Sequence, residues 1–406
     1  MAFIVKKFGG SSVATTAKIV GVAERVLKEK EPDDKIVLVV SAMGDTTDEL
    51  ISMAKAIDNR PSQREMDMLL STGEQITISL LTMAFQKLGV DAVSLTGGQA
   101  GIATSGVHAK ARIVDVNPER ILAELDKDKI VVVAGFQGVT ELGDITTLGR
   151  GGSDTTAVAL AGALGADICE IFTDVDGVYS ADPRVVKDAR RMKEITYNEM
   201  LEMARLGAVV MQPRSVEMGK HYGVPIHVRS TFTLEQGTII REEYTMKERE
   251  FTIRGVTHDV NVAKVAILGV PDQPGIAYTI FSALAEKAID VDMIVQSIRN
   301  ADKKIIDMVF TISKPDVDQA KVLVEKLVKD MGALGVVIDE NVAKVSVVGA
   351  GMYGSPGIAA TMFGALGEAG VNIEVISTSE ISISCLIKED QVKEAVNAIH
   401  QKFFKE

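Results

Sequence analysis

The chain has 406 residues and a formal net charge of −12; 46% of its residues are hydrophobic and 4% are aromatic. This length and composition exclude a disordered chain and favour an α/β enzyme of two or three domains. The acidic balance argues against nucleic acid as a partner, because binding to a phosphate backbone requires a broad basic surface.

The sequence favours a cytoplasmic protein that neither spans nor crosses a membrane. It has no N-terminal apolar segment with a cleavage site and no stretch of about 18 uninterrupted apolar residues. Cys169 and Cys385 lie far apart in separate apolar runs. This pattern indicates buried thiols in a reducing compartment rather than a disulfide.

Residues 1–245 form the first predicted domain, in which apolar strand-like runs alternate with helical patterns. Such alternation is typical of βαβ units and of a mostly parallel sheet that helices cover on both faces. Most of the runs end in Gly, Ser, Thr or Asp. Because the carboxyl ends of parallel strands share one edge, we expect a single ligand site there.

The first strand-like run is FIVKKFGGSS, residues 3–12. Its lysine precedes the glycines, so this segment is not a P-loop. Gly9 and Gly10 leave a predicted strand and lead into a helical pattern, and a glycine turn at a helix N-terminus attracts anions. On the residues alone, Lys7 is equally a phosphate-binding lysine or a solvated lysine at a strand end.

The next candidate, Glu74, lies in LLSTGEQITISLL. Ser71 and Glu74 have the spacing of a capping box in front of an apolar helical run. The same carboxylate is also suited to receive an amino group from a substrate. The spacing does not separate these two interpretations.

A second glycine cluster, DITTLGRGGSDTTAV, begins at residue 144 and leads into a helix. Ser153 is the expected N-cap, and Asp154 complements the helix dipole. We favour a further role for this segment, because small residues let the backbone approach a ligand closely. The guanidinium of Arg150 offers bidentate geometry to a carboxylate or phosphate, so we predict that it clamps a carboxylate.

The segment FTDVDGVYSADPR, residues 172–184, places Asp174, Asp176 and Asp182 after a predicted strand. It lacks the central glycine and the final glutamate of an EF-hand, which disfavours calcium. Turn formation and contact with a nucleotide or its magnesium both remain open. The histidines have no metal-binding spacing and no G-x-S-x-G elbow occurs, so we expect no protein-held metal and no hydrolase apparatus.

After a charged connector at 241–252, the pattern that starts at Val262 returns from Val342. Each copy reads strand, Pro-Gly turn, amphipathic helix and strand, followed by a second strand and helix. We therefore predict two ferredoxin-like βαββαβ modules, at 255–338 and 339–406.

Taken together, KKFGGSS, SAMGDTTDEL, STGEQ, GFQG, TTLGRGGSDTTA, DVDGVYSADPR and the Pro-Gly repeats resemble the aspartate kinase family. The resemblance extends from the first strand to STSEISIS near the end of the chain. It implies an amino-acid-kinase fold followed by two ACT modules. It also implies ATP-dependent phosphorylation of the β-carboxylate of L-aspartate, with Mg²⁺ accompanying the nucleotide, as the first step toward lysine, threonine and methionine.

The resemblance assigns roles to individual residues. The catalytic positions fall on Lys7, Arg150 and Asp154, and the aspartate-binding positions on Ser41, Thr47, Glu74 and Arg150. The nucleotide-binding positions fall on Lys7, Gly9, Gly10, Ser11, Thr173, Asp174, Tyr179, Asp182 and Arg184. Members often have GAKV where this chain has GAVV at 207–210, so Val209 replaces a lysine near the nucleotide. This departure supports the alternative of a catalytically weak amino-acid sensor.

The repeats imply feedback control by lysine, threonine or both. Effector positions in the first copy are Asp272, Gln273, Pro274, Gly275, Ile276, Ala277, Asp292 and Gln296. In the second copy they are Ser355, Gly357, Ile358, Asn372 and Ile373, which on the residues alone are equally ordinary turn residues. The resemblance further implies a homo-oligomer formed through the ACT modules, or a complex with a separate regulatory chain that begins near Met246.

Overall fold

The computed structural model describes residues 2–242, 253–300, 304–352 and 357–404. Within these ranges, no helix has both the length and the apolar character needed to cross a membrane. The chain forms two compact units, and each is described by itself. The first comprises Met1–Val178, Arg191–Ala204 and Val209–Thr245, and the second comprises Tyr179–Arg190, Arg205–Ala208 and Met246–Glu406.

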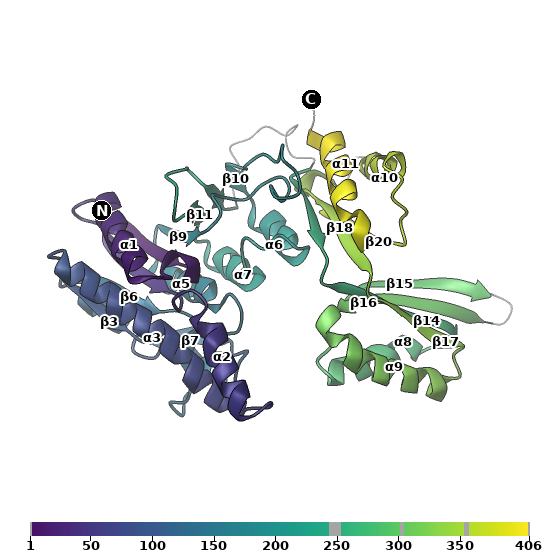
Figure 1. Cartoon of the computed structure of the whole chain (residues 1–406), viewed down its shortest axis with the longest axis horizontal. Coiled ribbons are helices and arrows are strands. Elements are labelled where there is room, and N and C mark those ends of the chain that lie inside the picture. Colours follow the sequence, from purple (N-terminus) through teal and green to yellow (C-terminus); the bar gives the residue numbers. More distant parts are fainter. Residues whose placement is uncertain (1, 243–252, 301–303, 353–356, 405–406) are drawn as a thin grey trace. The chain divides into compact units, whose positions relative to one another are not determined.

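An eight-stranded sheet forms the centre of the first unit (Figure 1), in the order β10-β12-β11-β9-β1-β2-β6-β3. Its strands are β1 (Phe3–Phe8), β2 (Lys35–Val40), β3 (Ala92–Leu95), β6 (Ile130–Ala134), β9 (Ile168–Thr173), β10 (Glu194–Ile195), β11 (Ile226–Ser230) and β12 (Thr238–Ile240). Every neighbouring pair is parallel except β11 and β12. The predicted, mostly parallel sheet is therefore confirmed.

The strand order reverses at β1, which lies between β2 on one side and β9 on the other. In open α/β sheets, ligands bind outside the carboxyl ends of the strands at such a switch point. The fold therefore directs attention to the residues that follow Phe8, Val40 and Thr173.

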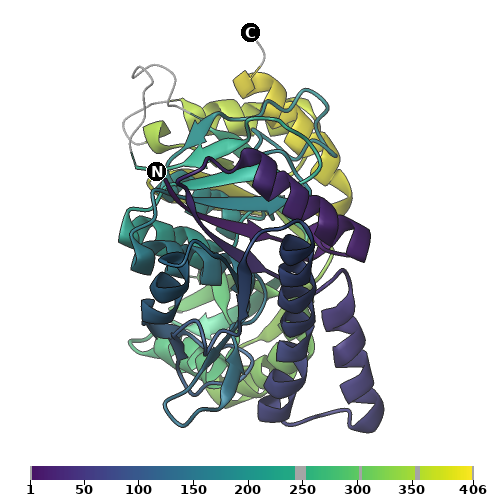
Figure 2. The same ribbon diagram turned by 90° about the vertical axis from the view of Figure 1, so that its left-hand side faces the viewer.

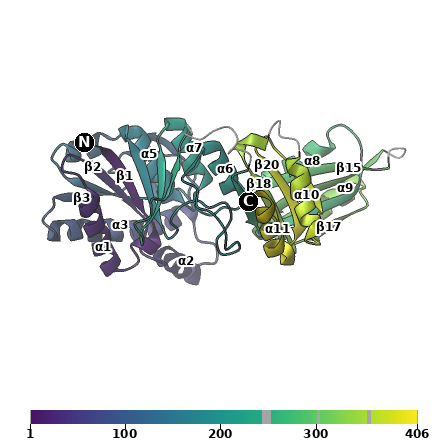
Figure 3. The ribbon, with the colours of Figure 1, turned by 90° about the horizontal axis from the view of Figure 1, so that it is seen from above.

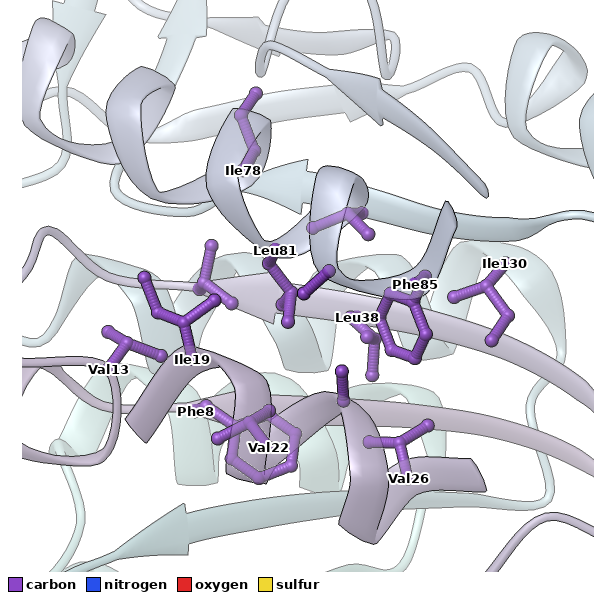
Figure 4. Close-up of a cluster of buried hydrophobic side chains, with 14 of the residues drawn as sticks. Phe8, Val13, Ile19, Val22, Val26, Leu38, Ile78, Leu81, Phe85 and Ile130 are labelled. Carbon is purple, nitrogen blue, oxygen red and sulfur yellow. The ribbon is translucent and has the colours of Figure 1, made fainter. Parts of the chain in front are cut away.

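Two helices, α1 (Thr16–Glu29) and α3 (Gln63–Lys87), cover one face of this sheet. Figure 4 shows side chains of both helices packed on those of β1, β2 and β6. The buried cluster includes Phe8, Ile19, Val22, Val26, Leu38, Leu81, Phe85 and Ile130. Burial of side chains of this size contributes roughly 1.5–3 kcal/mol each.

Helix α5 (Gly152–Leu164) contacts β1, β2 and β9 from the opposite face. Successive side chains of a strand point to opposite faces, so Lys7 lies on the other side of β1 from Phe8. Lys7 pairs with Asp154 of α5. The helix that follows the second glycine cluster thus covers the face toward which Lys7 points.

The remaining helices of this unit are α2 (Thr46–Ile57), α4 (Glu119–Leu125), α6 (Tyr197–Arg205) and α7 (Pro213–Tyr222). Helices α2 and α3 run side by side (Figure 2). A smaller sheet has the order β5-β4-β7-β8 and consists of β4 (Ile102–Thr104), β5 (Ile113–Val116), β7 (Gln137–Val139) and β8 (Ile145–Thr147).

The second unit contains two four-stranded antiparallel sheets, each accompanied by two helices (Figure 3). The first has the order β15-β16-β14-β17 and includes β14 (Val262–Pro271), α8 (Ile276–Glu286), β15 (Val291–Asn300), β16 (Ile305–Ser313), α9 (Val317–Met331) and β17 (Gly335–Asp339). The second has the order β13-β18-β20-β19 and includes β13 (Gly255–Asp259), β18 (Val342–Val348), α10 (Ile358–Glu368), β19 (Val375–Thr378), β20 (Ser382–Lys388) and α11 (Val392–Phe404). The paired ferredoxin-like modules are confirmed.

Strand β13 differs from the expected domain arrangement. The bounds 255–338 assign it to the first module, whereas it pairs antiparallel with β18 of the second. Val256 of β13 is buried among the side chains of that module. The assignment of this strand is corrected: the second sheet takes its edge strand from a segment that precedes both repeats.

The segment Tyr179–Arg190 also belongs to the second unit. Ala181 and Val186 are buried in the core that α10 and α11 form with their sheet, and Val256 N donates a hydrogen bond to Ser180 O at 2.7 Å. The sequence gives no sign of this packing, because the segment reads as a loop of the catalytic domain.

Candidate active site

Lys7 lies at the carboxyl end of β1 with a side chain that is mostly buried. Its Nζ atom is 2.6 Å from Oδ1 of Asp154 in the first turn of α5. This ion pair excludes the interpretation of Lys7 as a solvated lysine at a strand end. A lysine held at the switch point of the sheet is suited to bind phosphate.

The neighbouring Lys6 points to the other face of β1 and has a structural environment. Its Nζ atom lies 3.0 Å from Glu29 of α1 and 2.7 Å from Glu170 of β9. Burial alone would raise the pKa of Glu170, but contacts with His227, Lys6 and Arg229 lower it to about 2. Sequence reasoning misses this network, for which the only signal is a pair of adjacent lysines on a buried strand.

The turn after β1 is held between the ends of β2 and β9. Gly9 N donates to Phe172 O at 3.3 Å, and Gly44 N donates to Gly10 O at 3.1 Å. A Cβ atom on Gly10 would lie 3.0 Å from Ala42 O, so a larger residue would push these segments apart. Ser11 follows at the surface, in the short 3₁₀ turn Gly10–Ser12.

Glu74 lies in the interior of α3, which begins at Gln63, so a capping box with Ser71 is excluded. The Glu74 carboxylate accepts a hydrogen bond from Ala42 N at 3.0 Å through Oε1. Oε2 is buried and has no hydrogen-bond partner among the described residues. Burial raises the pKa of Glu74 to about 7, although the hydrogen bond from Ala42 opposes this shift. A buried carboxylate with one open oxygen is suited to receive a cationic group of a ligand.

Two hydroxyl residues from the expected aspartate site follow β2. Ser41 Oγ donates to Ser153 Oγ at 3.0 Å, which links the end of β2 to the first turn of α5. Thr47 is partly exposed in the first turn of α2. These hydrogen bonds and the Lys7–Asp154 ion pair bring four predicted site residues together at the ends of β1 and β2 and the start of α5: Lys7, Ser41, Glu74 and Asp154.

The loop before α5 carries Arg150 between two glycines in the left-handed region, Gly149 (φ 78°) and Gly151 (φ 68°). Gly151 is the N-cap, and the helix begins at Gly152. Ser153 is therefore a first-turn residue, and the expectation that it forms the N-cap is wrong. Arg150 is exposed, and no hydrogen bond or ion pair is found for its guanidinium within the described ranges.

The predicted nucleotide residues fall in both compact units. Thr173 ends β9, and its hydroxyl donates to Asp174 Oδ1 at 3.1 Å. Tyr179, Asp182 and Arg184 belong to the second unit, where Arg184 binds the Asp182 carboxylate at 2.8 Å and lowers the pKa of that group. Val209 is exposed in the first unit. Across the ranges that the structure describes, no cluster of three or more potential metal ligands occurs.

The described effector candidates lie in the second unit, at its two Pro-Gly turns, on β15 and just before β19. Asp272, Gln273, Pro274, Gly275 and Ala277 are exposed at the start of α8, where Ile276 is partly buried, and Gln296 is exposed on β15. Gly275 (φ 91°) and Gly357 (φ 102°) are the N-caps of α8 and α10, so the two repeats share this left-handed turn. Ile358 begins α10, and Asn372 and Ile373 precede β19. Ser355 and Met246 lie outside the described residues.

Two ion pairs connect the two repeats. Lys344 of β18 binds Asp292 of β15, and Lys264 of β14 binds Glu374 next to β19. These lysines occupy equivalent positions in VAKV of each repeat, and the two carboxylates are likewise equivalent. Asp292, an expected effector residue, is therefore also part of a symmetric contact between the modules.

Two protein-family models match the chain. The amino acid kinase family matches residues 2–230, and the ACT domain matches residues 265–327 and 345–403. The aspartokinase of Bacillus sp. strain MGA3 is 49% identical over 403 residues, which cover 99% of this chain and 97% of that protein. The chain belongs to the aspartokinase family. It is thus an enzyme of the kinase class.

Other aspartokinases agree with this membership. Aspartokinase 2 of Bacillus subtilis is 49% identical over 403 residues and is covered to 98% of its length. The crystal structure of Escherichia coli aspartokinase III in complex with aspartate and ADP is 25% identical, with a TM-score of 0.84 over 99% of this chain and 100% of that one. The likeness to aspartokinases therefore covers both the kinase part and the two ACT modules of the chain.

Proposed function

We propose that the crevice at the carboxyl ends of β1, β2 and β9 transfers the γ-phosphoryl group of ATP to the β-carboxylate of L-aspartate, giving 4-phospho-L-aspartate. The observation that carries this proposal is the buried Glu74 carboxylate, one oxygen of which has no hydrogen-bond partner among the described residues. It lies by the end of β2, next to β1, whose Lys7 pairs with Asp154 of α5. A relative, E. coli aspartokinase III, has been crystallised with aspartate and ADP, which supports the same pair of ligands here.

In this proposal the aspartate is held at both ends. The Glu74 carboxylate receives the substrate ammonium group, and the exposed guanidinium of Arg150 binds a carboxylate. Ser41 and Thr47 supply hydroxyl groups at the edge of the same pocket.

Lys7 binds the phosphates, with Asp154 keeping its ammonium group in position. The backbone of Gly9, Gly10 and Ser11 lies beneath them. The other residues proposed to contact the nucleotide are Thr173, Asp174, Tyr179, Asp182 and Arg184. These roles fit the family positions and the strand ends from which Lys7 and Thr173 project.

The reaction itself requires no protein base. The aspartate β-carboxylate is ionised at neutral pH, so one of its oxygens attacks the γ-phosphorus while the bond to the β-phosphate oxygen breaks. The electron pair leaves with ADP. Magnesium that accompanies the nucleotide would supply further positive charge to its phosphates.

We infer further that lysine, threonine or both inhibit the enzyme at the Pro-Gly turns, as end products of the pathway that this reaction opens. The packing of Tyr179–Arg190 supports this regulation, because Ser180 Oγ lies 2.9 Å from His400 Nε2 of α11. Tyr179, Asp182 and Arg184 thus belong to the same compact unit as the proposed effector sites. Assembly through the ACT modules, with a second copy or with a separate regulatory chain, belongs to the same proposal.

The alternative, a catalytically weak sensor, rests on Val209 at the position of a family lysine. Incubation with ATP, magnesium, aspartate and hydroxylamine separates the two, because hydroxylamine traps an acyl phosphate as a hydroxamate. We expect hydroxamate with aspartate and little with glutamate under matched conditions. Absence of product across a range of magnesium concentration and pH would favour the sensor.

A further inference from the structure

Asp67 is fully buried on α3, away from the residues assigned above to the reaction. Its Oδ1 accepts a hydrogen bond from Thr147 Oγ1 at 2.5 Å, and Ala109 N donates to both carboxylate oxygens at 3.0–3.1 Å. Oδ2 also lies 2.8 Å from His108 Nδ1. A buried carboxylate with this many partners fixes the segments that supply them.

Arg214 of α7 holds the same two segments from another helix. Its guanidinium donates to Leu148 O at 2.8 Å and to Ala111 O at 3.0 Å. Ala111 N in turn donates to Thr147 O at 2.9 Å. Asp67 and Arg214 therefore fix the chain around residues 109–111 and the two residues 147 and 148.

Arg150 follows this fixed point by two residues. It is exposed between glycines with positive φ, and its guanidinium makes no hydrogen bond or ion pair within the described part of the chain. The backbone of this loop can adopt many conformations, so Arg150 can bind a ligand in one geometry only if neighbouring residues are fixed. Leu148 is such a residue. Its carbonyl oxygen accepts a hydrogen bond from Arg214, and its N–H donates to Phe136 O.

The same helix that carries Asp67 carries Glu74, seven residues further on. Seven residues are close to two turns, so both side chains lie on one face of α3, about 10 Å apart along its axis. The helix thus joins the residue that anchors the Arg150 loop to the carboxylate proposed for the substrate ammonium group.

We propose that Asp67 and Arg214 are positioning residues that set the placement of Arg150 relative to Glu74, and so determine the affinity for a dicarboxylic amino acid. This inference rests on the proposed function, because it takes Arg150 and Glu74 as the two ends of the substrate site. Neither positioning residue touches the substrate; both act through the main chain of the Arg150 loop.

The test compares Asp67→Asn and Arg214→Met with the intact full-length enzyme in steady-state kinetics. Each variant is expected to raise KM for aspartate about 10-fold or more while KM for ATP changes less than twofold. Arg214→Lys keeps the positive charge with a single donor nitrogen in place of two, and should recover part of the affinity. Glu124→Gln is the matched control: it alters another buried, ion-paired carboxylate of the same unit and should leave both KM values unchanged, even if Tm falls.

A double variant distinguishes this inference from the proposed function. With Arg150→Ala already present, adding Asp67→Asn should raise KM for aspartate little further, because the arginine that it positions is gone. If the two substitutions instead multiply their effects on KM in the double variant, the positioning role is overturned, but the clamp role of Arg150 is not. The same holds if Arg150→Ala raises KM while Asp67→Asn and Arg214→Met both leave it unchanged. Unchanged KM in Arg150→Ala would remove the proposed clamp and this inference with it.

Discussion

Burial of the Glu74 carboxylate is unfavourable in free energy for its ionised form, and a bound substrate ammonium group would offset this penalty. The residue is 3% exposed, and one carboxylate oxygen lacks a hydrogen-bond partner among the described residues. Burial raises its pKa to about 7 from an ordinary value of 4.5. A ligand ammonium group would favour the ionised form, so binding energy and the charge of Glu74 are linked.

Glu74→Gln should therefore stabilise the ligand-free enzyme while damaging function. The raised pKa means that Glu74 contributes stability below pH 4.5, and that this stability is lost as pH rises to 7. We expect the variant and wild type to unfold alike near pH 4.5, and the variant to be more stable above pH 7, by an upper bound on the order of 3 kcal/mol. Thermal unfolding at several pH values measures this difference.

The same variant should raise KM for aspartate about 10²-fold, as expected for loss of a charge-assisted contact. Wild-type kcat/KM for aspartate should fall below pH 7, where Glu74 becomes protonated, and the variant should lose that dependence. A wild-type profile without an inflection near pH 7, combined with a normal KM in Glu74→Gln, would exclude Glu74 from the substrate site.

Residues such as Glu74 show where sequence reasoning stops. The Ser71-x-x-Glu74 spacing fits a helix start as well as a binding site, and only the start of α3 at Gln63 excludes the former. Lys7 was ambiguous for a similar reason, since its burial depends on α5, which is far away in sequence. Local spacing could identify these residues, but long-range packing determines their environment.

At the scale of elements, the approach of α3 to the end of β2 is set by a glycine. A Cβ atom on Gly73 would lie 2.8 Å from Ala42 Cβ, closer than such atoms approach in proteins. Ala42 N is the donor to Glu74. The close contact of helix and strand thus places the carboxylate beside the switch point.

Gly73→Ala and Gly21→Ala form a matched pair of helix substitutions. Gly21 lies in α1 with nothing within 4 Å of an added Cβ, so Ala should stabilise the enzyme by about 0.5–1 kcal/mol without changing kinetics. Gly73→Ala should destabilise it by about 1–3 kcal/mol and raise KM for aspartate. Denaturant unfolding and kinetics check both; equal effects of the two variants would contradict the close-approach argument.

Most elements were predictable because their apolar patterns are local. The alternating strands of 1–245 and the two Pro-Gly repeats both appear in the structure. The position of β13 was not predictable, since a five-residue edge strand carries no signal that selects one of two similar sheets. The start of α5 was also misplaced, because Gly151 caps the helix through its backbone conformation rather than through a side chain.

At the scale of the whole molecule, the proposed regulation can be tested at a position where the two repeats differ. Gln296 on β15 corresponds to Thr378 on β19, and both are exposed. Gln296→Ala should weaken inhibition by lysine or threonine about 10-fold while sparing kcat, because it removes an exposed hydrogen-bonding amide from β15. Thr378→Ala is the control at the equivalent position. Inhibition curves that match wild type would place the effector elsewhere.

The catalytic crevice remains the claim on which the rest depends. A crystal structure of the full chain with aspartate and a non-hydrolysable ATP analogue tests it most directly. We predict that the aspartate ammonium group contacts Glu74, that a carboxylate contacts Arg150, and that the γ-phosphate lies beside Lys7. Aspartate or nucleotide bound away from the carboxyl ends of β1 and β2 would contradict this site.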